Sequence, residues 1–256
     1  MCRLLGVVTR DPMRLADSLT DLIDPFTQLA CEHSDGWGIA AWHSDGELAL
    51  AKDVTPAHTS PAYTDVTTGP ATDAALLHIR MASPELAVDK HNTHPFTAGT
   101  VAFAHNGDFL PVEAIDHLID PDLLAGAAGN TDSERYFLRI LTLMREKDPA
   151  DAVAQAAADI RARAGIRSLN CLLLTQDALY AYAEEDPESE VSRRRGPDFF
   201  RLRYRVQDDR VIVASSGIPQ ATPDWSVLPY RQVLEVRRTD LRLTTRVEQV
   251  ALVTGR

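Results

Sequence analysis

The chain has 256 residues, of which 45% are hydrophobic and 25% are charged, and its formal net charge is -11. This length and apolar content suffice for a large buried core, and we expect a single domain over residues 2–256. Apart from Arg193-Arg194-Arg195, the basic residues are scattered along an acidic chain. This argues against nucleic acid or an anionic membrane as a partner and favours a small molecule or a protein.

Cysteine usage and hydropathy predict where the protein works. Cys2, Cys31 and Cys171 are widely spaced and contain no C-x-x-C pair, so neither a disulfide framework nor a thiolate zinc site is expected. No apolar run approaches the length of a membrane span, and Thr9-Arg10-Asp11 ends the N-terminal run too early for a signal sequence. We therefore predict a cytoplasmic protein without a membrane partner.

The first eight residues place a cysteine directly after the initiator methionine and ahead of an apolar run. Cys2 is small enough for a methionine aminopeptidase to remove Met1, which would leave a thiol and a free α-amine on one residue. The amine, with an ordinary pKa of about 7.7–8.0, can accept the thiol proton, which makes Cys2 a candidate nucleophile. The apolar run from Leu4 to Val8 is predicted to be a buried strand that fixes this terminus. On these residues alone, Cys2 is equally well an ordinary buried hydrophobic residue.

The first half of the chain alternates between helix and strand signals. Asp11-Pro12 is typical of a helix start, and leucines at helical spacing follow until Pro25 ends the pattern. Residues 56–70, rich in Thr and Pro, are expected to cover the surface. Predicted strands, the first two of which form a hairpin, cover residues 39–42, 48–51, 74–79 and 100–104. The last two end in polar residues, at Arg80 and at His105-Asn106-Gly107-Asp108.

The second half begins with helices and continues with strands. Thr131-Asp132-Ser133-Glu134 is a capping-box pattern that predicts a helix to Met144, after a shorter helix at 111–119. An alanine-rich helix at 149–164 should lie beside it in one layer. Predicted strands follow at 169–174, 179–183, 199–206, 211–214, 233–237 and 241–247, and the charged stretch 184–198 is expected to be a loop. This order favours a layered α+β fold over a doubly wound parallel sheet.

Six motifs together resemble the class II glutamine amidotransferases, which are N-terminal-nucleophile hydrolases. In the order of that family they are Met1-Cys2, His33-Ser34-Asp35-Gly36-Trp37-Gly38, His78-Ile79-Arg80, Asn92-Thr93-His94-Pro95-Phe96, His105-Asn106-Gly107-Asp108 and Thr131-Asp132-Ser133-Glu134. No synthase domain follows them, so the chain looks most like the stand-alone members, including the ergothioneine-pathway γ-glutamyl hydrolase type. The resemblance implies a four-layer αββα sandwich and catalysis without a cofactor.

The resemblance also implies a mechanism. Cys2 would attack the γ-amide carbon of glutamine or of a γ-glutamyl conjugate, and water would hydrolyse the resulting γ-glutamyl thioester. The side-chain amide of Asn106 and the backbone N–H of Gly107 would stabilise the oxyanion of each tetrahedral intermediate. From the residues alone, Asn106-Gly107 is also a favourable hairpin turn.

Four further residues are implied to bind the substrate. Arg80 resembles the family's anchor for the α-carboxylate, and Asp132 resembles the partner of the α-ammonium group. Taken by themselves, these residues also fit a surface arginine and a helix-stabilising aspartate, and Asp132 can serve both purposes. His94 resembles a pocket histidine that orients a loop or the substrate, and Ser83 a small hydroxyl residue near the carboxylate. Met81 departs from the aromatic residue that synthase-linked members often carry.

Two questions remain open in the sequence. A metal site among His78, His91, His94 and His105 is conceivable, but no accompanying carboxylate spacing supports it, and no metal is expected. The rivals to a hydrolase are a non-catalytic γ-glutamyl-binding or regulatory subunit, and a glutaminase subunit that supplies ammonia to a separate synthetase. A retained Met1 would favour the binding protein, because the proposed base would then be a peptide nitrogen.

Overall fold

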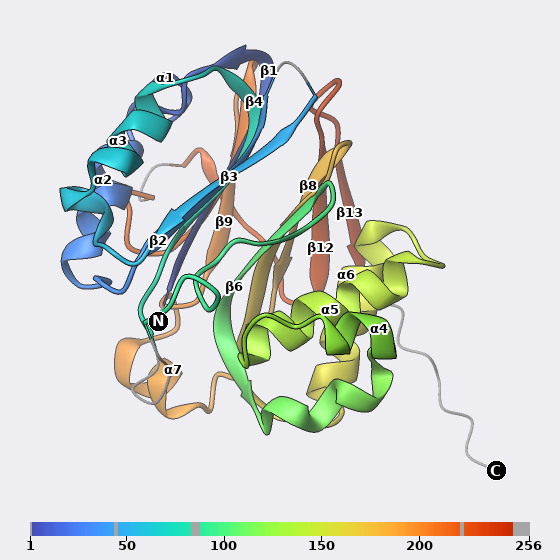
Figure 1. Cartoon of the computed structure of the whole chain (residues 1–256). Helices are drawn as coiled ribbons and strands as arrows, with labels where there is room; N and C mark the ends of the chain where they lie inside the picture. Colours follow the sequence, from blue (N-terminus) through green and yellow to red (C-terminus); the bar gives the residue numbers. More distant parts are fainter. Residues whose placement is uncertain (1, 44–45, 83–87, 221–222, 248–256) are drawn as a thin grey trace.

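The structure, a computed structural model, describes residues 2–43, 46–82, 88–220 and 223–247. Two antiparallel sheets face each other, and helices cover the outer face of each (Figure 1). The first sheet has the order β11 (Trp225–Val227), β9 (Leu202–Val206), β10 (Arg210–Ser215), β1 (Arg3–Met13), β4 (Thr72–Ile79), β2 (Trp37–His43) and β3 (Leu48–Asp53). The second has the order β13 (Leu243–Val247), β12 (Gln232–Arg237), β8 (Ala178–Ala183), β7 (Gly165–Leu174), β6 (Val101–Leu110) and β5 (Phe96–Ala98).

The helices form the two outer layers. The first sheet is covered by α1 (Leu15–Ser18), α2 (Ile23–Gln28) and α3 (Pro61–Thr68), with short 3-10 turns at Leu29–Cys31 and Ala57–Thr59. The second is covered by α4 (Pro121–Ala125), α5 (Asp132–Met144) and α6 (Pro149–Arg161), preceded by a 3-10 segment at Val112–Leu118, while α7 (Glu190–Arg195) lies near the N-terminus (Figure 1). The expected αββα sandwich is confirmed. None of the helices in the described part of the chain is long and apolar enough to cross a membrane.

Three hydrophobic cores separate the four layers, and the alternation of side chains along each strand assigns residues to them. In β1, Leu4 and Val8 belong to the core between the sheets, whereas Leu5 and Val7 face the layer of α1 and α2. The third core lies between the second sheet and α5 and α6. Even-numbered residues near the start of β1 therefore point into the space between the sheets.

Some helix predictions were wrong for identifiable reasons. The Asp11-Pro12 pair does not start a helix, because β1 continues to Met13, which pairs with Thr72 of β4. Pro25 does not end one, because it lies in the first turn of α2, where a missing N–H costs no hydrogen bond. The segment 56–70 contains α3, whose N-cap Ser60 accepts a hydrogen bond from the N–H of Tyr63 at 3.3 Å.

Other elements differ from the predictions in their bounds or were not predicted. The charged stretch 184–198 contains α7, and β5 and β11 were not predicted. His105 to Asp108 lie within β6 rather than after it, because β7 pairs with them. The capping box forms only in part: Thr131 accepts from the N–H of Glu134 at 3.1 Å, but the Glu134 carboxylate accepts from the N–H groups of Ala128 and Gly129 instead. The hairpin of β2 and β3 and the neighbouring helices α5 and α6 are confirmed.

At Gly6 the two sheets lie close together, and its replacement tests this packing. A Cβ atom at this position would lie 2.7 Å from Cδ2 of Leu179 on the opposite sheet. We expect Gly6→Val to lower the free energy of unfolding by about 1–3 kcal/mol through overpacking, as measured by urea titration. Gly165→Val, at an exposed strand position, is the matched control and should change it much less. Equal effects of the two substitutions would contradict the inferred close contact.

Candidate active site

The pairing of β1 with β4 brings Cys2 and Arg80 together. Leu4 pairs with His78 and Arg3 with Ile79, so the next positions along the two strands are Cys2 and Arg80. Because side chains alternate, Cys2 lies on the same face as Leu4, which contacts the core between the sheets. Two positions 78 residues apart in sequence therefore become neighbours at one end of the sandwich.

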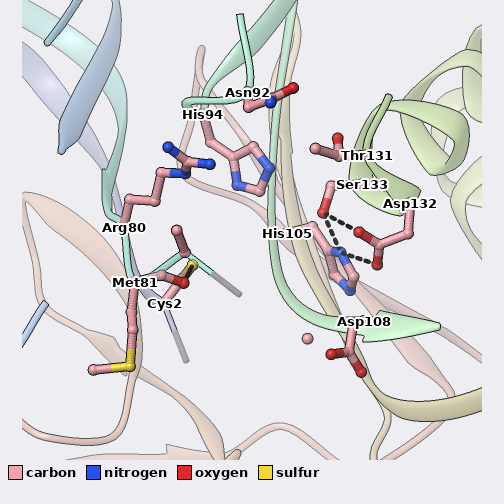
Figure 2. Close-up of a pocket in the computed structure, with 12 residues that line it drawn as sticks. Cys2, Arg80, Met81, Asn92, His94, His105, Asp108, Thr131, Asp132 and Ser133 are labelled. Carbon is pink, nitrogen blue, oxygen red and sulfur yellow. Dashed lines mark hydrogen bonds and ion pairs between the residues drawn. The ribbon is translucent and has the colours of Figure 1, made fainter. Parts of the chain in front are cut away.

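A pocket opens at this end of the sandwich, between the two sheets (Figure 2). Cys2, Arg80 and Met81 form one wall, and in Figure 2 Asp132, Ser133 and His105 lie on the opposite side. The complete lining is Cys2, Arg80, Met81, Ala82, Asn92, His94, His105, Gly107, Asp108, Thr131, Asp132 and Ser133.

The loop before β2 holds the backbone around Arg80. The N–H of Arg80 donates to the carbonyl of Gly36 at 2.8 Å, and the carboxylate of Asp35 accepts from the N–H of Ala82 at 2.8 Å. Gly38, further along, allows the segment that carries His94 to cross β2, because a Cβ there would overlap the His94 carbonyl oxygen. Trp37, between these residues, packs in the outer core against Tyr63, with ring centroids 5.2 Å apart.

Cys2 is half-buried, and its Sγ lies 3.6 Å from the carbonyl oxygen of Met81. Burial raises the pKa of the Cys2 thiol, because the thiolate would lose solvation, and the positive charge of Arg80 opposes this shift. A base is therefore needed to make this thiol a nucleophile near neutral pH. All three cysteines are free thiols, with Cys31 exposed and Cys171 buried.

Arg80 and Asp132 place opposite charges on the two walls. Burial lowers the pKa of the Arg80 guanidinium and raises the pKa of the Asp132 carboxyl, as expected for ions removed from water. One oxygen of Asp132, Oδ2, accepts from the N–H of Phe109 at 3.1 Å, which fixes the carboxylate at the start of α5. Such a pair of walls can bind a molecule that carries a carboxylate and an ammonium group on one carbon.

His78 and His94 form a buried pair. Nε2 of His78 lies 3.0 Å from Nδ1 of His94, so one ring donates to the other. Burial lowers the pKa of both histidines well below the usual 6.5, and the Arg80 charge acts in the same direction. Both rings are therefore neutral at physiological pH. Nζ of Lys52 donates to the carbonyls of Thr93 at 2.8 Å and Pro95 at 3.3 Å and so holds the segment that carries His94.

The residues proposed as oxyanion donors lie on β6. Asn106 follows Ala102 and Ala104 on the face toward the first sheet, and its side chain is fully buried. Neither polar atom of its amide has a hydrogen-bond partner among the described residues. A buried amide without partners is costly, so a ligand that satisfies it would be favoured. Gly107 lines the pocket, and a Cβ there would overlap the carbonyl oxygen of Ser168.

The structure collects most of the residues singled out in the sequence. Cys2, Arg80, His94, Gly107 and Asp132 line one pocket, and Asn106 lies beside it in β6. Ser83 lies outside the described residues. Within those residues, no group of three or more His, Cys, Asp and Glu side chains is arranged to hold a metal ion.

Sequence reasoning did not assign Asn92, His105, Asp108 or Ser133 to the pocket, although all four lie inside the motifs that carry the family resemblance. The available signal was their position in those motifs. By pattern alone, Ser133 belongs to a capping box, and His105 fits a predicted strand end or a histidine metal site.

Comparison with known proteins gives consistent relatives. Residues 1–230 match the family described as glutamine amidotransferases class-II. A probable glutamine amidotransferase, DUG3 of Saccharomyces cerevisiae, is 24% identical over 300 aligned positions that cover 95% of this chain and 84% of that protein. A glutamine aminotransferase class-II domain protein from Silicibacter pomeroyi has a similar structure, with a TM-score of 0.68 and 24% identity over 97% of this chain and 100% of that one. An allosteric regulatory enzyme of purine biosynthesis has a TM-score of 0.63 and 15% identity over 98% of this chain and 50% of that one.

The neutral histidine pair predicts how stability depends on pH. In the unfolded chain both histidines regain a pKa near 6.5, so below this pH the unfolded chain binds protons that the folded protein excludes. Stability must therefore fall as pH falls, with a slope that approaches about 1.4 kcal/mol per pH unit for each histidine only well below pH 6.5. Between pH 7 and 5.5 we expect His78 and His94 together to remove about 2–3 kcal/mol, as measured by urea titration.

Substitution identifies the source of this pH dependence. His94→Gln should remove about half of it, whereas His58→Gln, at an exposed position, should leave it unchanged. The assignment is wrong if the double variant His78→Gln/His94→Gln keeps the full dependence.

Proposed function

The chain belongs to the class II glutamine amidotransferases, and we propose that it cleaves the γ-amide of glutamine or of a γ-glutamyl conjugate through a thioester on Cys2. The observation that carries this proposal is one pocket in which Cys2 and Arg80 lie on one wall and Asp132 lies on the opposite wall. The family acts generally in hydrolysis and transfer of the glutamine amide. The thioester and the substrate are our inference for this chain.

The proposed reaction uses Cys2 twice. After removal of Met1, the α-amine of Cys2 accepts the thiol proton and Sγ attacks the γ-carbonyl carbon. The tetrahedral intermediate collapses as the C–N bond breaks, and the proton passes to the departing nitrogen, which leaves as ammonia or an amine. Water then attacks the thioester carbon, the α-amine removes its proton, and the C–S bond breaks to release glutamate and the thiol. No step requires a cofactor.

Two groups on β6 are proposed to stabilise the negative charge of the tetrahedral intermediates. The buried Asn106 amide, which has no partner among the described residues, would donate to the oxyanion together with the backbone N–H of Gly107. Asn106 and Cys2 lie on the facing surfaces of the two sheets, which is the arrangement this role requires.

The substrate is proposed to be anchored by its α-amino acid end. Arg80 would bind the α-carboxylate and Asp132 the α-ammonium, with His94 as a neutral orienting group and Ser83 near the carboxylate. Free glutamine and a larger γ-glutamyl amide share this end, so both fit the proposed contacts. We further propose that residues 2–256 form one domain, that the protein is cytoplasmic and that a synthetase can act as its partner in trans.

The nucleophile is tested by intact mass followed by glutamate release from glutamine and from γ-glutamyl amides. We expect loss of Met1, glutamate in excess over protein, and no measurable release by Cys2→Ala, because no other group can form the thioester. Cys31→Ala, which removes an exposed thiol, is the matched control and should retain activity. The protein is a γ-glutamyl-binding or regulatory subunit instead if three results coincide: Met1 has been removed, no amide is cleaved, and no alkylated Cys2 can be trapped. Weak release that rises on addition of a synthetase would identify an ammonia-supplying subunit.

The oxyanion assignment predicts different effects for two neighbouring amides. Asn106→Ala should lower kcat by about 10²–10³-fold with little change in KM or in stability, because the Asn106 amide has no hydrogen bond to lose within the described part of the chain. Asn170 of β7 lies opposite Asn106 in the β6–β7 ladder. Its side chain donates to the Phe200 carbonyl and accepts from the N–H of Glu184. Asn170→Ala should therefore lower the free energy of unfolding by about 1–3 kcal/mol. An Asn106→Ala enzyme with full kcat would exclude this amide as a donor.

A further inference from the structure

His105 is held at both ring nitrogens. Its Nε2 lies 3.0 Å from the carbonyl oxygen of Ser168, and its Nδ1 lies 2.9 Å from Oγ of Ser133. A carbonyl oxygen can only accept a hydrogen bond, so Nε2 carries the proton and donates. In the neutral ring Nδ1 is then an acceptor, and the Ser133 hydroxyl must donate to it.

The single hydroxyl proton of Ser133 has a second possible acceptor. Oγ of Ser133 lies 3.4 Å from Oδ1 of Asp132, whereas Nδ1 of His105 lies farther from the carboxylate, 3.9 Å from Oδ2, and Figure 2 shows these contacts joining the three side chains in a triangle. When Asp132 is ionised and empty, its carboxylate attracts the proton that would otherwise fix His105. When an ammonium group pairs with Asp132, this attraction weakens and the Ser133 hydroxyl donates its hydrogen bond to Nδ1 of His105. The direction of the Ser133 hydrogen bond therefore depends on whether Asp132 is occupied.

His105 connects these contacts to the proposed oxyanion donors. His105 directly precedes Asn106 and Gly107 in β6, and the Ser168 carbonyl that accepts from His105 is packed against Gly107. A Cβ on Gly107 would also lie 2.9 Å from Nε2 of His105. A ring that is clamped between Ser133 and Ser168 therefore restrains the peptide that presents the Gly107 N–H.

We propose that Ser133 and His105 are positioning residues that couple the α-ammonium site at Asp132 to the oxyanion donors of β6. The α-amino group of the substrate then raises kcat as well as affinity, so the enzyme selects γ-amides with a free α-amino group in the chemical step. This inference rests on the proposed function and specifies how its site rejects other amides. Neither residue reacts with the substrate in this account.

Two amides and two variants test the coupling by ammonia release. The substrates are glutamine and 4-carbamoylbutanoate, which is glutamine without its α-amino group. In the native enzyme, loss of that group should lower kcat by about tenfold or more in addition to raising KM. In Ser133→Ala, glutamine should be turned over with a reduced kcat, and loss of the α-amino group should now raise KM alone. Ser133→Thr, which restores a hydroxyl, should recover the dependence of kcat on the α-amino group.

The controls separate coupling from general damage. Ser18→Ala removes a buried serine hydroxyl that bonds within α1, in the outer helix layer and not in the pocket lining, and should keep the native ratio of kcat values. Should Ser133→Ala not fold, His105→Phe, which removes both ring nitrogens, should abolish the dependence in the same way. The proposal is overturned if the native ratio of kcat values persists in Ser133→Ala or in His105→Phe. A native enzyme that releases ammonia or amine from no γ-amide overturns the proposed function and this inference together.

Discussion

The antiparallel pairing of β1 with β4 is the constraint on which the site depends. It places Cys2, at the start of one strand, beside Arg80, at the end of the other, and directs both toward the second sheet. A strand that begins at the third residue is held on both edges, by β4 and by β10, so the N-terminus cannot fray as chain ends usually do. The backbone ladder thus sets the position of Cys2.

Burial then sets the electrostatics of the pocket. Removal from water raises the pKa of Cys2 and Asp132 and lowers the pKa of Arg80, His78 and His94. Keeping Arg80 and Asp132 charged on the two walls therefore costs desolvation free energy when the pocket is empty. A ligand of complementary charge reduces that cost. The histidine pair stays neutral, which leaves Arg80 as the cation on its wall without competition from an imidazolium.

Close backbone contacts assemble the parts of the site that come from different elements. Gly38 lets the segment that carries His94 cross β2, and Gly107 lets β6 approach the Ser168 carbonyl. Lys52 ties the same His94 segment to β3 through two backbone carbonyls. Only glycine fits at positions 38 and 107, because a Cβ there would overlap the carbonyl oxygen of His94 or of Ser168.

The sequence by itself determined the order of the motifs, a layered α+β fold and the main strands and helices, and the family resemblance added the four-layer sandwich. Apolar runs and helical periodicity located β4, α5 and the later strands other than β11. The same local reasoning misplaced the first helix at Asp11-Pro12 and ended the strand before His105. Turn and capping preferences there are overridden by ladder pairing with β4 and β7, which is not visible locally.

Only the tertiary structure decided how the motif residues meet. It showed that Asn106 is a buried amide whose partners are absent among the described residues, whereas the Asn-Gly pair by itself also fits a turn. It also joined Ser133 to His105 across 28 positions of sequence, at 2.9 Å. Sequence spacing cannot reveal such a contact, because it forms only when α5 packs against the second sheet.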